Sequence, residues 1–137
     1  MIRVYTDGAF STSRQVMGWA FIVIMDDFVT TKDWGGILGG TNNRAEIHAV
    51  IEAIKYLNNQ NNQNIKKFTL CTDSMYIIGT MTQNWKRSKN IDLWNELDNL
   101  VKDKKIDWQH VKGHSGNKWN ELCDILAVEG SHLILSK

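Results

Sequence analysis

The sequence predicts an α/β domain whose five-stranded mixed sheet is flanked by helices. Segments with alternating or continuous hydrophobic residues are typical of strands, and segments with hydrophobic residues at three- and four-residue spacing are typical of helices. Their order along the chain is β-β-β-α-β-α-α-β-α. An early hairpin followed by strand–helix alternation indicates a mixed sheet with helices packed on its faces. No boundary or structural repeat divides residues 1–137, so we expect one domain with one sizeable core.

Three strands are expected before the first helix. Alternation of residue types from Ile2 to Asp7 predicts a first strand that ends at Asp7-Gly8, and residues 9–15 are predicted to form a loop. Val16–Met25 is hydrophobic and β-prone, Asp26-Asp27 marks a tight turn, and Phe28–Trp34 continues as a third strand, so the second and third strands form a hairpin. Two pairs of glycines then break the pattern, Gly35-Gly36 and Gly39-Gly40.

The segment Thr41–Leu57 has the pattern of an amphipathic helix. The stripe that faces the core consists of Ala49, Val50, Ala53, Ile54 and Leu57. Continued back by one turn, this stripe reaches Glu46, whose carboxylate is costly to bury unless a cation, a proton or hydrogen bonds compensate it. The alternative for Glu46 is a first-turn acid that the helix dipole favours. Thr41, Asn42 and Asn43 supply side chains that can cap the helix.

The second half of the chain alternates strands and helices. Residues 58–64 (NNQNNQN) are expected to form a polar surface loop. A basic stretch with one tryptophan, residues 85–89, leads to Asn90. The closing helix carries a hydrophobic stripe of Trp119, Leu122, Cys123, Leu126 and Ala127. The other predicted elements are a strand at Phe68–Thr72, helices at Ser74–Gln83 and Ile91–Val101, a strand at Ile106–Val111 and a glycine-flanked loop at Lys112–Gly116.

Composition narrows the classes of function. Sixteen basic and fifteen acidic residues give a net charge of +1, so nucleic-acid binding would depend on a local basic patch. No hydrophobic run reaches membrane-spanning length and the first residues do not resemble a signal peptide, so we expect a cytoplasmic protein without membrane contact. We also expect a monomer. Cys71 and Cys123 lack metal-type spacing, and we expect buried, reduced thiols, with one disulfide as the alternative.

Two aspartates share a local pattern, Tyr-Thr-Asp-Gly at residues 5–8 and Cys-Thr-Asp-Ser at residues 71–74. Each pattern places its aspartate, Asp7 or Asp73, at the carboxyl end of a predicted strand, where α/β proteins usually place their sites. On neighbouring strands about 4.8 Å apart, two carboxylates repel one another unless cations lie between them. Glu46, and Asp124 at the edge of the last helical stripe, can join them. Four such oxygen ligands suit Mg²⁺ or Mn²⁺, although each aspartate alone is more typical of a turn or cap.

Six short motifs occur in a specific order. They are TDGA at residues 6–9, TNNRAE at 41–46, TDS at 72–74, DLW at 92–94, VKGHSGN at 111–117 and NELCD at 120–124. With their element context, these motifs resemble type 1 ribonuclease H across nearly the whole chain. The resemblance implies the ribonuclease H fold and endonucleolytic cleavage of the RNA strand of RNA–DNA hybrids, leaving 5′-phosphate and 3′-hydroxyl ends. It also implies two Mg²⁺ ions, with Mn²⁺ as an alternative, that activate a water and stabilise the departing oxygen. Their ligands would be Asp7, Glu46, Asp73 and Asp124.

The resemblance also implies a proton-transfer role and contacts to RNA. It gives His114 a role in proton transfer or product departure, whereas without the flanking match an exposed loop histidine is the simpler interpretation. Asn42 and Asn43 would reach the RNA 2′-hydroxyl in the minor groove, with helix capping as their alternative or additional role. The backbone around Gly8 and Ala9 would also touch the RNA strand. The remaining histidines match no motif and are interpreted as surface or packing residues: His48, His110 and His132.

For the DNA strand, the resemblance implies a phosphate pocket that includes Thr41 and Asn90, and an aromatic-lined channel for which Trp85 is the best candidate. The helical spacing of Trp94 favours core packing over DNA contact. The best-known cellular members insert a basic helix and loop where this chain has only Lys86–Lys89, and the loop after the first strand is short and holds no asparagine. Fewer cations release fewer counterions on binding, so we expect weaker hybrid affinity than in members with the insertion. A preference for Mn²⁺ over Mg²⁺ is a separate expectation.

Other proteins with the same type of fold fit the sequence less well. A proofreading exonuclease would have Asp-x-Glu in the first strand, but Ala9 stands two residues after Asp7. Integrases and transposases space their acids differently and would not need the segment at residues 111–124. A hybrid-binding module without catalysis is the alternative from another class, although no acid is missing. Met1 directly before the first strand favours a free-standing protein over a domain cut from a reverse transcriptase.

Overall fold

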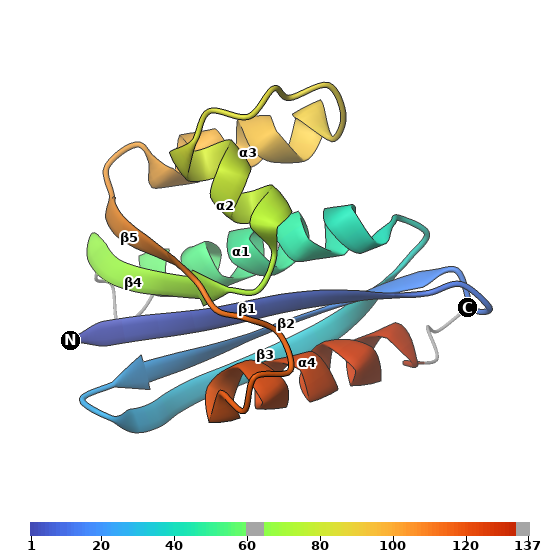
Figure 1. Cartoon of the computed structure of the whole chain (residues 1–137), viewed down its shortest axis with the longest axis horizontal. Helices are drawn as coiled ribbons and strands as arrows, with labels where there is room; N and C mark the ends of the chain where they lie inside the picture. Colours follow the sequence, from blue (N-terminus) through green and yellow to red (C-terminus); the bar gives the residue numbers. More distant parts are fainter. Residues whose placement is uncertain (60–64, 134–137) are drawn as a thin grey trace.

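A computed structural model of the chain describes residues 1–59 and 65–133, and these form a five-stranded sheet with helices on both faces (Figure 1). Most of the segment expected as a polar loop, residues 60–64, lies outside the described range. The strands are β1 (Ile2–Ser11), β2 (Val16–Met25), β3 (Phe28–Leu38), β4 (Lys67–Thr72) and β5 (Lys105–His110). The helices are α1 (Asn42–Asn58), α2 (Met75–Thr82), α3 (Ile91–Val101) and α4 (Lys118–Ser131).

The sheet is mixed, as the sequence predicts. Its strands lie in the order β3-β2-β1-β4-β5. β1, β2 and β3 form antiparallel pairs, whereas β4 is parallel to both β1 and β5. The predicted turn at Asp26-Asp27 is present, and both residues have positive φ angles of 51° and 71°. Two-residue hairpin turns of this kind match the twist of the strands they join. The predicted order of elements is therefore confirmed.

Two strands extend beyond their predicted ends. The prediction of a loop from residue 9 is wrong for Ala9–Ser11, because this stretch continues the antiparallel pairing of β1 with β2 as far as the Ser11–Val16 pair. The prediction that Gly35-Gly36 breaks the third strand is also wrong. Both glycines pair with β2, and a Cβ on Gly36 would overlap the carbonyl oxygen of Gly130 in α4. Glycine is used here because the helix backbone packs directly on the strand.

The helices form two layers. α1 packs on β1 and β2 and also contacts α2 and α3, while α4 covers β1, β2 and β3 on the opposite face (Figure 1). The predicted hydrophobic stripe of α1 is confirmed, because Ala49, Val50, Ala53, Ile54 and Leu57 are all fully buried. Trp94 is 1% exposed and belongs to the same core, as expected. Within residues 1–59 and 65–133, no helix is both long and apolar enough to cross a membrane.

The two cysteines are buried and free, as expected, so the disulfide alternative is wrong. Cys71 lies on β4 and Cys123 on α4, and both belong to the core between α4 and the sheet. The Cys123 Sγ donates to the backbone oxygens of Tyr5, at 3.6 Å, and Ala20, at 3.4 Å. Burial raises the pKa of both thiols above the ordinary value. They are therefore packing residues rather than reactive groups.

Candidate active site

Three carboxylates meet where β1, β4 and α1 come together. One oxygen from each of Asp7, Glu46 and Asp73 lies within 4.8 Å of the other two. Asp7 is 2% exposed and Glu46 is 7% exposed, while Asp73 is partly open to solvent. The structure thus brings together three of the four acids that the sequence predicts as metal ligands.

Strand pairing places the two aspartates. β1 and β4 are adjacent and parallel, and the last residues that pair across them are Tyr5 and Cys71. Asp7, which lies within β1, and Asp73, the first residue after β4, each follow two residues later, so they lie at the same level and on the same side. Ser74 then caps α2 by accepting a hydrogen bond from the Ile77 N–H at 3.2 Å, so the helix begins two residues after Asp73.

The third acid, Glu46, is placed by direct contact between β1 and α1. Gly8 is buried beneath α1, and a Cβ on it would overlap the backbone of Ala45 and Glu46. The Gly8 N–H also donates to Asp7 Oδ1 at 2.9 Å. Because a strand can approach a helix backbone this closely only without a side chain, Gly8 allows the Glu46 carboxylate to reach Asp7.

The electrostatics of this group require compensation. Burial raises the pKa of Asp7 from 3.8 to about 8, with further contributions from the charges of Asp73 and Asp124. Burial, followed by the charges of Asp7 and Asp73, also holds the pKa of Glu46 well above 4.5. Among the described residues, Asp7 Oδ2 and Glu46 Oε1 are buried without a hydrogen-bond partner. Buried oxygens that lack partners in an all-carboxylate group fit a hard divalent cation, which supplies both the missing partner and the missing charge.

Asp124 reaches the group from the opposite layer. It lies on α4, is half-buried, and stays outside the group of three mutually close acids. Its negative charge contributes to the raised pKa of Asp7. The fourth predicted acid is therefore beside Asp7 rather than at the centre of the group.

His114 lies on an exposed loop next to the acids. It has a positive φ of 55°, in the loop between β5 and α4. The loop begins at Val111, whose N–H donates to the Thr72 oxygen at 2.9 Å, and a Cβ on Gly113 would lie 3.3 Å from Asp73 Oδ2. The loop that carries the imidazole therefore lies against the acid group at Gly113.

The other histidines agree with their expected structural roles. His110 and His132 are exposed. His48 packs against Trp19, with ring centroids 5.9 Å apart, and lies 3.7 Å from the Glu52 carboxylate.

The residues expected to contact RNA lie at the start of α1 and along β1. Thr41 caps the helix, and its Oγ1 accepts from the Arg44 N–H at 3.1 Å. Asn42 and Asn43 are exposed, and within the described part of the chain their side chains form no hydrogen bonds. The sequence offers three residues as possible caps, and Thr41 is the one that caps the helix. The amides of Asn42 and Asn43 are exposed to solvent. Ala9 is half-buried, whereas Gly8 is covered by α1.

Two of the residues expected to contact DNA, Trp85 and Asn90, lie in the segment between α2 and α3. Trp85 is 43% exposed, and its ring packs on α2 where a Cβ on Gly79 would overlap it. Asn90 is half-buried, and its side chain bonds to Arg44 and Tyr76. Sequence reasoning missed Arg44 and Tyr76 as partners of Asn90, although Arg44 lies inside the TNNRAE motif.

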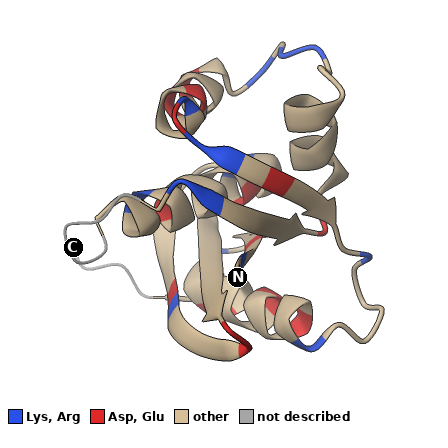
Figure 2. Ribbon diagram, turned by 90° about the vertical axis from the view of Figure 1, so that its left-hand side faces the viewer, with Lys and Arg blue, Asp and Glu red and all other residues tan. Residues whose placement is uncertain are grey.

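The short basic stretch has fewer free cations than its composition suggests. No helix or strand forms between Thr82 and Ile91, and the stretch is the short blue segment between α2 and α3 in Figure 2. Arg87 turns inward, where it pairs with Asp98 and lies over the Trp94 ring at 5.3 Å. Lys86 and Lys89 remain exposed.

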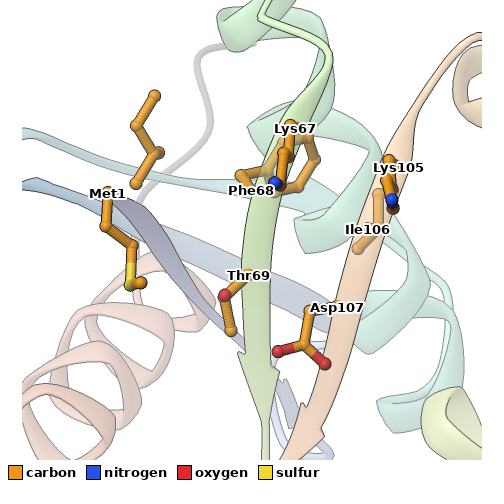
Figure 3. A pocket seen from close by; sticks show the side chains of 8 residues that line it. Met1, Lys67, Phe68, Thr69, Lys105, Ile106 and Asp107 are labelled. Atoms are coloured by element: carbon orange, nitrogen blue, oxygen red, sulfur yellow. The ribbon is translucent and has the colours of Figure 1, made fainter.

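A separate pocket of about 560 Å³ lies at the other end of β4 and β5. Figure 3 shows its side chains, with Thr69 and Asp107 on neighbouring strands facing the same space. Its lining holds one carboxylate and two lysines, so it lacks the chemistry of the acid group. The lining residues are Met1, Ile2, Lys67, Phe68, Thr69, Lys105, Ile106 and Asp107.

Comparisons with known proteins agree with this geometry. The RNase H family model matches residues 1–132. Ribonuclease H of Wolbachia sp. subsp. Drosophila simulans (strain wRi) is 40% identical over 140 residues, covering 92% of each chain. Ribonuclease H of Treponema denticola is 38% identical over 152 residues, covering 93% of this chain and 95% of that protein.

The fold also matches a solved structure. The N-terminal RNase H domain of a Mycobacterium tuberculosis protein, solved as a fusion with maltose-binding protein, superposes with a TM-score of 0.80 at 19% identity. The match covers 95% of this chain and 92% of that chain.

Proposed function

Because the chain belongs to the ribonuclease H family, we propose that it hydrolyses the RNA strand of RNA–DNA hybrids as a metal-dependent endonuclease that leaves 5′-phosphate and 3′-hydroxyl ends. The observation that carries the proposal is the group of Asp7, Glu46 and Asp73, whose oxygens lie within 4.8 Å of one another. Two of these carboxylates are buried with unpartnered oxygens and raised pKa values, which is an arrangement that a bound divalent cation stabilises.

Asp7, Glu46, Asp73 and Asp124 are the proposed ligands of two Mg²⁺ ions, with Mn²⁺ as the alternative. When bound, such ions lower the pKa of a water that attacks the phosphate and stabilise the negative charge on the departing 3′ oxygen. Burial of Asp7 and Glu46 keeps both side chains in one geometry and excludes competing water. All of these acids lie on one chain, so the site needs no second copy, and we propose that the monomer is active.

His114 is the proposed proton-transfer residue. Its loop is exposed and lies against Asp73 at Gly113. The imidazole can therefore hold or move a proton beside the acids without being a metal ligand. The same exposure lets the loop move when product leaves.

The start of α1 is the proposed recognition element for the RNA strand. The exposed amides of Asn42 and Asn43 can donate to or accept from a ribose 2′-hydroxyl, which DNA lacks. The backbone at Gly8 and Ala9 lies along the same strand that carries Asp7.

For the DNA strand, we assign Thr41 and Asn90 to a phosphate and the exposed ring of Trp85 to a sugar or base. Thr41 can cap the helix and still bind phosphate, because its hydroxyl accepts from Arg44 while its own hydrogen remains available.

The test of this function is cleavage of labelled RNA–DNA hybrid, duplex RNA and duplex DNA with Mg²⁺, Mn²⁺ or a chelator. We expect internal cuts in the RNA of the hybrid alone, with metal. Products should carry 5′ phosphates that phosphatase removes and 3′ hydroxyls that a polymerase extends. Cleavage in chelator, or equal cleavage of duplex RNA, would overturn the proposal.

A pair of variants tests the acid group itself. Asp73→Asn should lower kcat by about a thousandfold or more, because it removes a charged metal ligand. Asp107→Asn is the matched control, since Asp107 is an exposed aspartate on neighbouring β5 outside the acid group, and it should leave kcat unchanged. An Asp73→Asn protein that cleaves hybrid at the unmodified rate would show that the carboxylates are not the metal site.

A further inference from the structure

Asn90 occupies the N-cap position of α3, yet its side chain does not cap the helix. Its backbone is left-handed, with φ 60° and ψ 31°, and no side-chain cap hydrogen bond is formed. The amide lies between two other helices instead. Arg44 Nη1 donates to Asn90 Oδ1 at 3.2 Å, and Asn90 Nδ2 donates to the Tyr76 hydroxyl at 2.9 Å. The side chain of an asparagine at an N-cap usually accepts a hydrogen bond from a backbone N–H of its own helix, whereas the Asn90 side chain bonds to residues of two other helices.

The Arg44 partner is itself fixed. Its guanidinium donates two hydrogen bonds to the Asp92 carboxylate, at 3.0 Å and 2.7 Å, and so joins α1 to the first turn of α3. Such bidentate pairs hold the guanidinium in one plane. The hydrogen bonds from Arg44 lower the pKa of Asp92 to about 2, so the pair is ionised at neutral pH.

The Tyr76 partner is fixed from the other side. Its hydroxyl oxygen also accepts from Trp94 Nε1 at 3.3 Å, and its ring packs against the Trp94 ring with centroids 5.4 Å apart. Trp94 is 1% exposed, so Tyr76 is attached to the core of the helical layer.

These two partners determine the orientation of the Asn90 amide, that is, the positions of its oxygen and its nitrogen. Arginine has only donors, so Arg44 can bond to the oxygen of Asn90 and not to its NH2 group. The NH2 group must then face Tyr76, which takes one of its two hydrogens. Across residues 1–59 and 65–133, the second hydrogen of Asn90 Nδ2 has no acceptor.

We propose that Arg44 and Tyr76 are positioning residues that hold the Asn90 amide in one orientation, with its second Nδ2 hydrogen presented to a phosphate oxygen of the DNA strand. This inference rests on the proposed function, which assigns Asn90 to the DNA strand. A side chain that is already immobilised loses less conformational entropy when the substrate binds. Removing either partner therefore weakens substrate binding without changing the chemistry of cleavage.

The experiment is a double-mutant cycle in steady-state hybrid cleavage with Tyr76→Phe and Asn90→Gly. Phenylalanine keeps the ring contact with Trp94 and loses the hydroxyl, and glycine accepts the left-handed backbone of residue 90 without strain. We expect Tyr76→Phe to raise KM about three- to tenfold with kcat unchanged. In the Asn90→Gly background the same substitution should have no further effect on KM, because the residue it positions is gone.

Tyr56→Phe is the matched control. It also removes a hydroxyl that forms a side-chain hydrogen bond, in this case to Thr31, but its partner lies on β3 away from Asn90. Its KM should equal that of the unmodified protein. Arg44→Lys provides a second variant, because lysine cannot bond to Asp92 with two prongs and to Asn90 at once. It should raise KM as Tyr76→Phe does.

The outcomes separate this inference from the proposed function. An equal rise in KM from Tyr76→Phe with and without the Asn90 side chain, or no rise at all, would overturn the positioning role while hybrid cleavage and the Asn90 contact stand. An unchanged KM in Asn90→Gly alone would remove Asn90 from the DNA contact and the positioning inference with it. Loss of hybrid-specific cleavage in the unmodified protein would instead overturn the function itself.

Discussion

Gly8 on β1 packs directly against Ala45 on α1, with no space between them for even one methyl group. Each is the immediate neighbour in sequence of an acid, Asp7 in the strand and Glu46 in the helix. This backbone contact therefore sets the distance between the two most buried carboxylates of the site.

Gly8→Ala should separate these acids. The added Cβ overlaps Ala45 and Glu46, so α1 must shift away from β1. We expect the Mg²⁺ concentration for half-maximal activity to rise at least about tenfold, with a loss of roughly 1–3 kcal/mol in the free energy of unfolding. A magnesium titration of cleavage and a thermal melt measure the two effects.

Ile24→Val is the control for a general loss of stability. Ile24 is buried on β2 away from the acids, and its substitution should cost about 1 kcal/mol and leave the Mg²⁺ midpoint unchanged. Equal Mg²⁺ midpoints for Gly8→Ala and the unmodified protein would show that the glycine contact does not determine the site.

The metal-free protein should lose stability as pH rises from 6.5 to 8. The pKa of Asp7 is about 8 in the folded protein and about 3.8 when unfolded, so the folded state binds more protons throughout this interval. The unfolding free energy then falls as pH increases. The raised pKa of Glu46 has the same sign. The lowered pKa of His48 has the opposite sign, but it acts below its ordinary value of 6.5. Melting temperatures in chelator across the interval test this.

Added Mg²⁺ should reverse that trend. The cation favours the ionised carboxylates, so it should raise the melting temperature more at pH 8 than at pH 6.5. Asp7→Asn should flatten the pH dependence in chelator and reduce the Mg²⁺ effect. Asp33→Asn, which alters an exposed aspartate on β3, should do neither. Chelator melting temperatures that rise between pH 6.5 and 8 would contradict the assignment.

His114→Ala should slow turnover while metal affinity is retained. The imidazole is exposed on its loop and is not among the closely grouped acids, so its loss removes proton transfer but no metal ligand. We expect kcat to fall about tenfold to a hundredfold and the Mg²⁺ midpoint to stay constant. His110→Ala, at an exposed histidine nearby in sequence, serves as the control. A collapse of Mg²⁺ affinity in His114→Ala would identify His114 as a ligand instead.

Hybrid binding should depend only weakly on salt. Of the short basic stretch, Arg87 is committed to Asp98 and Trp94, which leaves Lys86 and Lys89 to face phosphates. Replacing both lysines by Gln should reduce the slope of log Kd against log salt by no more than about two. Arg87→Gln should leave the slope unchanged and lower stability by about 1 kcal/mol or less. A titration of labelled hybrid in the Asp73→Asn background measures this, and a steep initial slope would contradict it.

Gly130→Ala should destabilise the protein, although alanine is normally the better helix former. Gly130 is buried in α4, and a Cβ there would overlap the Gly35 carbonyl. We expect a loss of roughly 2–4 kcal/mol in the free energy of unfolding, against a gain of up to about 1 kcal/mol at an open helix position. Glu129→Ala, exposed on the same helix, should change stability by less than about 0.5 kcal/mol. Denaturant melts compare the two, and a stabilised Gly130→Ala would show that α4 does not pack on the glycines.

Periodicity predicted the elements well wherever one face of an element is buried. The stripe of α1 and the bounds of α3 follow directly from hydrophobic spacing, because each helix buries a single face. The errors at Ala9–Ser11 and Gly35-Gly36 have a common cause. These residues are strands because of what they pair with, β2 in both cases, and not because of their own hydrophobic pattern.

The acid group was predictable for a similar reason. Asp73 follows β4 directly and Asp7 lies at the matching level of β1, and the adjacency of these two parallel strands brings the two aspartates together. The partners of Asn90 were not predictable, because Arg44 and Tyr76 come from two other helices and meet it only after α1, α2 and α3 have packed. The inward turn of Arg87 was missed because composition counts a charge without showing its direction.

α1 runs without interruption from Asn42 to Asn58, so the residues proposed to hold RNA and the acid proposed to hold metal are joined by continuous helix. A helix rises about 1.5 Å and turns about 100° per residue, which places Glu46 about 6 Å along the axis from Asn42. The helix geometry therefore sets the distance between the proposed recognition amide and the proposed metal ligand. One inserted residue would rotate Glu46 away from Asp7. The geometry of the helix backbone therefore sets the spacing between the ribose proposed to be recognised and the phosphate proposed to be cleaved.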